Sequence, residues 1–209
     1  EDIIIAGERG ANVVLMGMVT GAENAALRRV TITPFSDEAY LFDMNDVTMS
    51  LRDVTFVGSP ERDRTAMLVD GVRPGNSVID GCTFTSLGVG IDVMDAIPTI
   101  RRCTFGDMPA SFGDPATPGA GIIIRDNTVK ALEYTTKALG DTTNPNSGWN
   151  DFLPTIEGVA VINEREEELV MQSNYWGSED PEEIALRVEG PAVQEPVLVQ
   201  RSAILAATM

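Results

Sequence analysis

The phrase IDGCTF, at Ile79–Phe84, returns 21 residues later as IRRCTF, at Ile100–Phe105. Both cysteines of the chain lie in this phrase, at the same position. Looser copies are LRRVTI at Leu27, LRDVTF at Leu51, IRDNTV at Ile124 and MQSNYW at Met171. Successive copies are 24, 28, 21, 24 and 47 residues apart, the last step being about two periods. Such self-similarity is typical of a solenoid, in which each repeat packs on its neighbours.

A second phrase lies between the copies of the first. It reads AYLFD ending at Asp43, AMLVD at Asp70, GVGID at Asp92 and VAVIN at Asn163, with GAGII at Gly119 as a looser copy. Its alternation of apolar residues indicates a half-buried strand. Two short strands in a period of about 24 residues predict a parallel β-helix of about seven coils. A leucine-rich repeat is disfavoured, because TFVGSP and TFTSLG contain no helical return.

The phrases IRRCTF, IRDNTV and GVGIDVMDAIPTI resemble right-handed parallel β-helix repeats of the pectin-lyase-like superfamily, and SNYWGSEDPEEI resembles its closing coil. The resemblance covers roughly residues 30–188. It implies an all-β fold, a right-handed parallel β-helix, but it is weak evidence for any one activity. We predict a single domain over residues 1–209, with loop insertions around 106–120 and 130–155. A short C-terminal capping helix should begin after Asp180, since Pro181 and Glu183 suit its first turn.

Composition excludes several classes of function. The formal net charge is −17, so nucleic acid backbones and anionic membranes would be repelled. The absence of histidine excludes mechanisms that depend on imidazole. No apolar run approaches the roughly 18 residues of a membrane-spanning helix, and the first residues show no basic secretory n-region.

The repeat register predicts columns of side chains along the solenoid. One inward column should contain Val30, Val54, Cys82, Cys103, Asn127 and Asn174. This register favours the cysteines as core residues, with a disulfide between them as the alternative. The adjacent inward column should contain Ile32, Phe56, Phe84, Phe105 and Val129.

The first candidate site is a column of aspartates at the end of the second strand, formed by Asp43, Asp70 and Asp92. Stacked carboxylates need relief of their repulsion, which could come from a cation such as Ca²⁺. Two carboxyls about 5 Å apart would also suit retaining sugar hydrolysis. The alternative is that these aspartates cap turns and face water.

The second candidate is a basic stripe, in which Arg28, Arg52, Arg101 and Arg125 share one outward position. It reverses the sign of an acidic protein and could bind carboxylates or sulfates of an anionic glycan. The alternative is structural, through ion pairs with Asp53, Asp80 and Asp126.

The third candidate is the irregular sequence of the two predicted insertions. Phe112, Tyr134, Trp149 and Phe152 could present flat faces to sugar rings, with polar contacts from Asp114, Asp141, Asn144, Asn146 and Asp151. The alternative is that the aromatic residues pack the loops onto the solenoid.

These patterns together favour a non-catalytic cell-surface or secreted β-helix module that binds a glycan or has an adhesive or structural role, located outside the cell or in its envelope. The expected ligand contacts are Trp149, Tyr134, Phe112, Asp114, Arg101 and Arg125. A polysaccharide lyase or glycoside hydrolase acting on an acidic polysaccharide is the alternative, with Asp43, Asp70 and Asp92 as its acids. No cofactor is required, although Ca²⁺ stays open. We expect no nucleic acid partner and no membrane span, and self-association along the helix axis is a further alternative.

Overall fold

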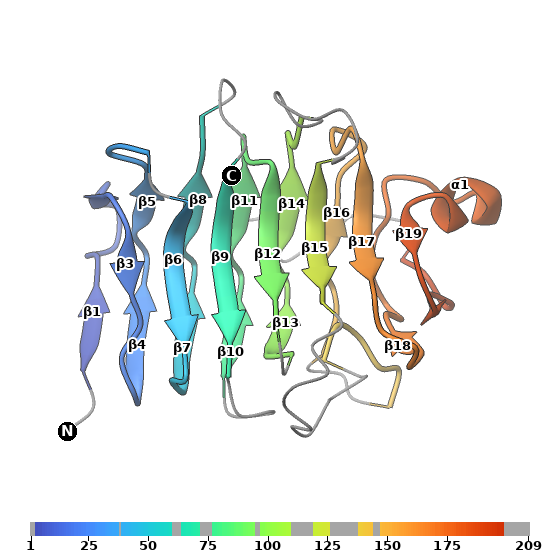
Figure 1. Ribbon diagram of the computed structural model, residues 1–209, viewed down its shortest axis with the longest axis horizontal. Helices are drawn as coiled ribbons and strands as arrows, with labels where there is room; N and C mark the ends of the chain where they lie inside the picture. The colour runs from blue at the N-terminus through green and yellow to red at the C-terminus, as the bar shows by residue number, and fades with distance from the viewer. Residues whose placement is uncertain are drawn as a thin grey trace.

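The computed structural model describes residues 3–37, 39–59, 64–71, 77–94, 97–109, 119–125, 138–143 and 147–198. Its strands pair in parallel within each sheet and wind into a β-solenoid of about six turns, rather than the seven expected (Figure 1). Most turns contribute one short strand to each of three sheets, which we name A, B and C. The all-β parallel architecture predicted from the repeats is therefore confirmed.

The strands recur in the order A, B, C along the chain. Sheet A contains β1 (Ile4–Ala6), β4 (Ala25–Arg28), β7 (Met49–Arg52), β10 (Val78–Asp80) and β13 (Thr99–Arg101). Sheet B contains β2 (Val14–Met16), β5 (Thr31–Thr33), β8 (Thr55–Val57), β11 (Thr83–Thr85), β14 (Thr104–Gly106) and β16 (Asp151–Phe152). Sheet C contains β3 (Val19–Thr20), β6 (Tyr40–Asn45), β9 (Thr65–Asp70), β12 (Val89–Val93), β15 (Ala120–Ile124), β17 (Val159–Asn163) and β19 (Val188–Glu189). A separate pair, β18 (Leu169–Val170) and β20 (Ala192–Val193), lies at the C-terminal end.

Sheets A and B meet at a sharp corner made by one residue per turn. In six successive turns this residue has a positive φ between 52° and 65°: Arg29, Asp53, Gly81, Arg102, Trp149 and Ser173. One left-handed residue redirects the chain, so that the next strand starts on another face. We call this column of residues, together with the outward ends of the sheet A strands, the A–B corner.

The inward column beside this corner agrees with the sequence prediction over its first four members. Val30, Val54, Cys82 and Cys103 are at most 3% exposed, and both cysteines are free thiols. The next two members are Asn150 and Asn174, because β16 pairs with β14 and Tyr175 bridges Asp151. Asn150 takes the place that the prediction gave to Asn127, which lies outside the described residues.

This difference has a physical origin in strand pairing. Ile122–Ile124 pair with β12 and β17 in sheet C, so IRDNTV begins inside a sheet C strand and not in sheet A. The segment SGWNDF, at 147–152, supplies the missing copy of the first phrase. The predicted insertion at 130–155 therefore contains part of the solenoid, namely β16.

An aromatic ladder runs along the core. Phe56, Phe84, Phe105, Phe152 and Trp176 stack on successive turns, with ring centroids 4.7–5.1 Å apart and interplanar angles of 16° or less. Val129, expected in this ladder, lies outside the described residues. The column of sheet C that faces this aromatic ladder consists of small residues. They are Ala66, Gly90, Gly121 and Ala160. A Cβ on Gly90 would lie 2.9 Å from the Phe105 ring, so the ladder accounts for the glycine.

The predicted short helix is confirmed. Helix α1 (Pro181–Ala185) begins after Asp180, whose Oδ1 accepts a hydrogen bond from the Glu182 amide at 2.9 Å. It lies beyond β19, at the end of the solenoid opposite β1 (Figure 1). Its Ile184 side chain is buried. Within the described parts of the chain, no helix is long and apolar enough to cross a bilayer.

Candidate functional site

The three aspartates of the first candidate do not form one column. Asp43 pairs with Leu68, and Leu68 pairs with Asp92, whereas Asp70 pairs with Asn45. The predicted alignment of Asp70 was therefore wrong by two residues. A shift of two keeps every side chain on its own face of the sheet, so the apolar alternation could not reveal it. In the described part of the chain, no cluster of three or more Asp, Glu, Cys or His side chains is placed to hold a metal ion.

Asp92 forms an ion pair with Arg125 instead of facing another aspartate. The Arg125 guanidinium donates to Asp92 at 3.0 and 3.3 Å and to Glu164 at 2.8 Å. The hydrogen bond with Asp92 raises the pKa of Arg125. Arg125 thus links three neighbouring turns of sheet C, and its predicted place in the basic stripe was wrong because it follows β15 rather than a sheet A strand.

The rest of the basic stripe is present on sheet A. Arg28 pairs with Arg52, Arg52 with Asp80, and Asp80 with Arg101. Arg29 and Arg102 lie one residue further along, at the corner. We call Arg28, Arg29, Arg52, Arg101 and Arg102 the arginine corner. Only two carboxylates, Asp53 and Asp80, lie among these five cations in the two columns, so the local charge opposes that of the whole protein.

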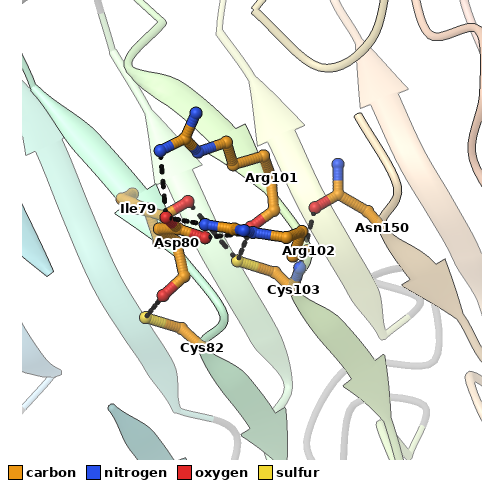
Figure 2. Close-up of polar contacts among 7 residues, drawn as sticks. All are labelled: Ile79, Asp80, Cys82, Arg101, Arg102, Cys103 and Asn150. Carbon is orange, nitrogen blue, oxygen red and sulfur yellow. Dashed lines mark hydrogen bonds and ion pairs between the residues drawn. The ribbon is translucent and has the colours of Figure 1, made fainter. Parts of the chain in front are cut away.

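Asp80 anchors one end of the arginine corner. It is 4% exposed and lies between two guanidinium groups, as Figure 2 shows. Arg101 Nη2 donates to it at 3.0 Å and Arg102 Nε at 2.6 Å, while Arg102 Nη2 makes a further contact. The hydrogen bond to Asp80 raises the pKa of Arg102. The structural alternative, in which the arginines form ion pairs, is thus confirmed for Arg101 and Arg102. Both cations, however, share the single carboxylate of Asp80.

The other end of the arginine corner has no such anchor. Neither Arg28 nor Arg52 forms an ion pair with any residue that the structure describes. The Nε of Arg28 is buried and has no hydrogen-bond acceptor there. Two adjacent cations with unused donors are a suitable site for a carboxylate or sulfate.

Trp149 continues the same corner by one turn beyond Arg102. The Arg102 amide donates to the Gly148 carbonyl at 3.0 Å, and the Trp149 side chain is 38% exposed. Trp149 has φ = 63°, which is uncommon for a bulky residue. Glycine or asparagine would adopt this turn at lower cost, so the backbone conformation does not explain a tryptophan here.

The structure thus brings together two of the six predicted ligand contacts, Arg101 and Trp149, and separates Arg125 from them. Phe112, Asp114 and Tyr134 lie outside the described residues. Of the polar groups expected around them, Asp141 and Asp151 are buried. The proximity of Arg102 and Trp149 was not recognised, because 47 residues separate them. The signal for it was the match of GWNDF to RRCTF, which was obscured by aspartate in place of threonine.

On the inner side of the corner, the column of buried side chains changes from cysteine to asparagine between Cys103 and Asn150. Cys103 donates its amide to Asn150 Oδ1 at 3.0 Å, and its thiol contacts the Arg101 carbonyl at 3.3 Å (Figure 2). Burial raises the pKa of the Cys103 thiol well above its usual value. An inert, protonated thiol is therefore expected here.

Comparison of the chain with protein-family models, with curated proteins and with solved structures gives no match. The parallel β-solenoid itself is thus what the structure establishes.

Proposed function

We propose that the protein is a non-catalytic β-solenoid module that binds an anionic glycan along the A–B corner, outside the cell or in its envelope. The observation that carries this proposal is the arginine corner, a concentration of cations on a protein of net charge −17. The negative charge on the rest of the protein would repel a polyanion. The cluster of arginines can therefore attract a polyanion only locally, at the arginine corner.

The two ends of the A–B corner would bind different parts of the glycan, with Arg28 and Arg52 at one end and Trp149 at the other. Arg28 and Arg52, on neighbouring turns about 4.8 Å apart, can hold successive acidic groups of one chain. Trp149 presents a partly exposed ring against which a sugar can pack. Arg101 and Arg102, fixed by Asp80, keep the intervening surface positive.

Glycan titration by calorimetry tests this proposal. Oligogalacturonate and a sulfated glycan should bind, and dextran should not compete. The double variant Arg28→Gln/Arg52→Gln should weaken binding at least about tenfold, or about 1.4 kcal/mol. Arg125→Gln removes one charge from sheet C and should change affinity less than about twofold, after its fold is checked by circular dichroism. Equal binding by wild type and the double variant would refute the assignment.

The enzyme alternative is examined in the same samples. Asp43 and Asp92 lie two turns apart, about 9.6 Å by strand spacing, which exceeds the roughly 5 Å of a retaining carboxylate pair. Unsaturated products or new reducing ends, with or without Ca²⁺, would show turnover. Turnover abolished by Asp70→Ala would replace a binding function with a catalytic one.

Self-association along the helix axis is a second candidate, favoured by the edge of the first turn. Ile3, Ile4, Ile5, Met16 and Met18 are each 53–65% exposed there. Exposed apolar strand edges are places where another strand can pair. Analytical ultracentrifugation of wild type and Ile4→Lys tests this: a concentration-dependent species that the variant loses supports it, and a monomer at every concentration excludes it.

A further inference from the structure

A cleft lies between the loops that connect sheets B and C in two neighbouring turns. Its volume is about 490 Å³, within the range of small-ligand sites. One wall comes from the segment Thr33–Asp37, between β5 and β6. The other comes from Gly58, Ser59 and Arg64, between β8 and β9. No candidate drawn from the sequence includes these residues.

Phe35 is the most exposed aromatic side chain described in the structure, at 75%. It belongs to the cleft wall rather than to the ladder, and its sequence context, TPFSD, is that of a polar turn. A single exposed apolar residue is ordinary on a protein surface. Here, however, the ring borders a cleft that also contains hydroxyl, carboxylate and guanidinium groups, which is the composition of a ligand site.

Arg64 holds this wall in place. Its side chain is only 5% exposed, and its Nη2 donates to the carbonyl of Ser36, the residue next to Phe35. The same nitrogen lies 3.8 Å from the Asp37 carboxylate. A buried guanidinium that bridges from one turn to the loop of the preceding turn fixes the backbone beneath Phe35. The ring is therefore presented in advance of binding, which lowers the entropic cost of association.

The charges of the cleft select the ligand class. Arg64 and Asp37 oppose each other within the cleft, so the site offers paired charges rather than an excess of one sign. Thr33 and Ser59 add hydroxyl groups to its lining. From the aromatic face, the paired charges and the hydroxyls we infer that this cleft binds a neutral sugar ring, which stacks on Phe35 and exchanges hydrogen bonds with Asp37, Ser59 and Thr33.

This site is separate from the arginine corner in position and in ligand chemistry. The cleft lies between sheets B and C, and the arginine corner lies between sheets A and B. Either can therefore fail without the other.

Neutral oligosaccharides of glucose, mannose and galactose, titrated by calorimetry and by ligand-observed NMR, provide the test. At least one should bind wild type, and Phe35→Ala should weaken it at least about tenfold while Phe35→Tyr retains it. Ser59→Ala should weaken it by a smaller factor, and Arg28→Gln/Arg52→Gln should leave it unchanged. Unfolding of Phe35→Ala should match wild type, because the ring is exposed.

Three results would overturn the inference. The first is that no neutral oligosaccharide binds at millimolar concentration. The second is that Phe35→Ala binds as wild type does. The third is that only acidic sugars bind and that Phe35→Ala weakens them, which would assign the cleft to charged ligands.

Discussion

The inner and outer sides of the A–B corner carry opposite kinds of side chain on one backbone. Inside, Val54, Cys82 and Cys103 are fully buried residues of similar size. Outside, the corner positions of the same three turns are Asp53, Gly81 and Arg102, which differ in charge and volume. Packing against the neighbouring turns restricts the inner column, whereas the outer column has to satisfy only the turn. Stability should therefore depend on the inner side and binding on the outer side.

The largest expected loss of stability follows from removing one ring of the aromatic ladder. Phe105→Ala should lower the free energy of unfolding by about 4 kcal/mol, because the ring stacks on Phe84 and Phe152 and is fully buried. Chemical denaturation followed by circular dichroism measures this. Phe35→Ala, at a 75% exposed phenylalanine, is the matched control and should lose less than about 0.5 kcal/mol. Equal losses would show that the ladder does not hold the turns together.

The next largest effect concerns the polar part of the inner column. Asn150→Ala should cost about 3 kcal/mol, since several buried groups lose partners. Asn150 Oδ1 accepts the Cys103 amide, and its Nδ2 donates to the Ile100 carbonyl and to Asn174 Oδ1, all at 3.0 Å. Asn45→Ala, at an exposed strand end, should change stability little. A tolerated Asn150→Ala would mean that water can replace these bonds.

A smaller effect is expected opposite the ladder. Gly90→Ala should lower the free energy of unfolding by about 2 kcal/mol, because the new Cβ would lie 2.4 Å from the Gly121 carbonyl oxygen. The equivalent residue on the preceding turn, Ala66, already carries a Cβ and is fully buried. Ala66→Gly should cost only about 0.5–1 kcal/mol through chain entropy. Thermal and chemical unfolding of both variants would distinguish them, and a neutral Gly90→Ala would refute the steric account.

The contrast between the two sides also explains what the sequence could reveal. The inner columns repeat because each turn packs on the next, so Cys82, Cys103 and the phenylalanines indicated the fold and its register. An insertion separates the turns of Cys103 and Asn150, so the copy of the phrase that contains Asn150 lies 47 residues after the copy that contains Cys103. The prediction therefore assigned IRDNTV to this turn instead. The apolar alternation has a period of two residues, so it could not distinguish the true register of Asp70 from one shifted by two residues.

The candidate site was less predictable than the fold for a different reason. The stripe of Arg28, Arg52 and Arg101 followed from the register, and the structure confirms it. The contact between Arg102 and Asp80 depends on the rotamers of long side chains, which sequence does not specify. The Phe35 cleft depends on how two loops pack, and loops do not share the repeat.

The buried thiol of Cys103 should make stability depend on alkaline pH. Burial raises the pKa of the Cys103 thiol in the folded state. The folded protein therefore resists ionisation that the unfolded chain undergoes near pH 8.5, so stability is full below that value and falls as pH rises toward the raised pKa. The slope for one thiol is at most about 1.4 kcal/mol per pH unit. Denaturation of wild type and Cys103→Ala between pH 7 and 10 checks it, and parallel slopes would contradict it.

The smallest stability effect is expected on the outer side, where the comparison is sharpest. Arg52 is exposed and has no ion pair among the described residues, so Arg52→Gln should change the free energy of unfolding by less than about 0.5 kcal/mol. Any change should shrink at high salt, because the neighbouring charges of Arg28 and Asp80 are then screened. Salt-dependent unfolding measures this, and calorimetry on the same sample measures glycan affinity. If glycan affinity falls while the free energy of unfolding does not, Arg52 contributes to ligand binding and not to the stability of the fold. A loss of stability above about 1 kcal/mol would instead mean that the outer column stabilises the fold.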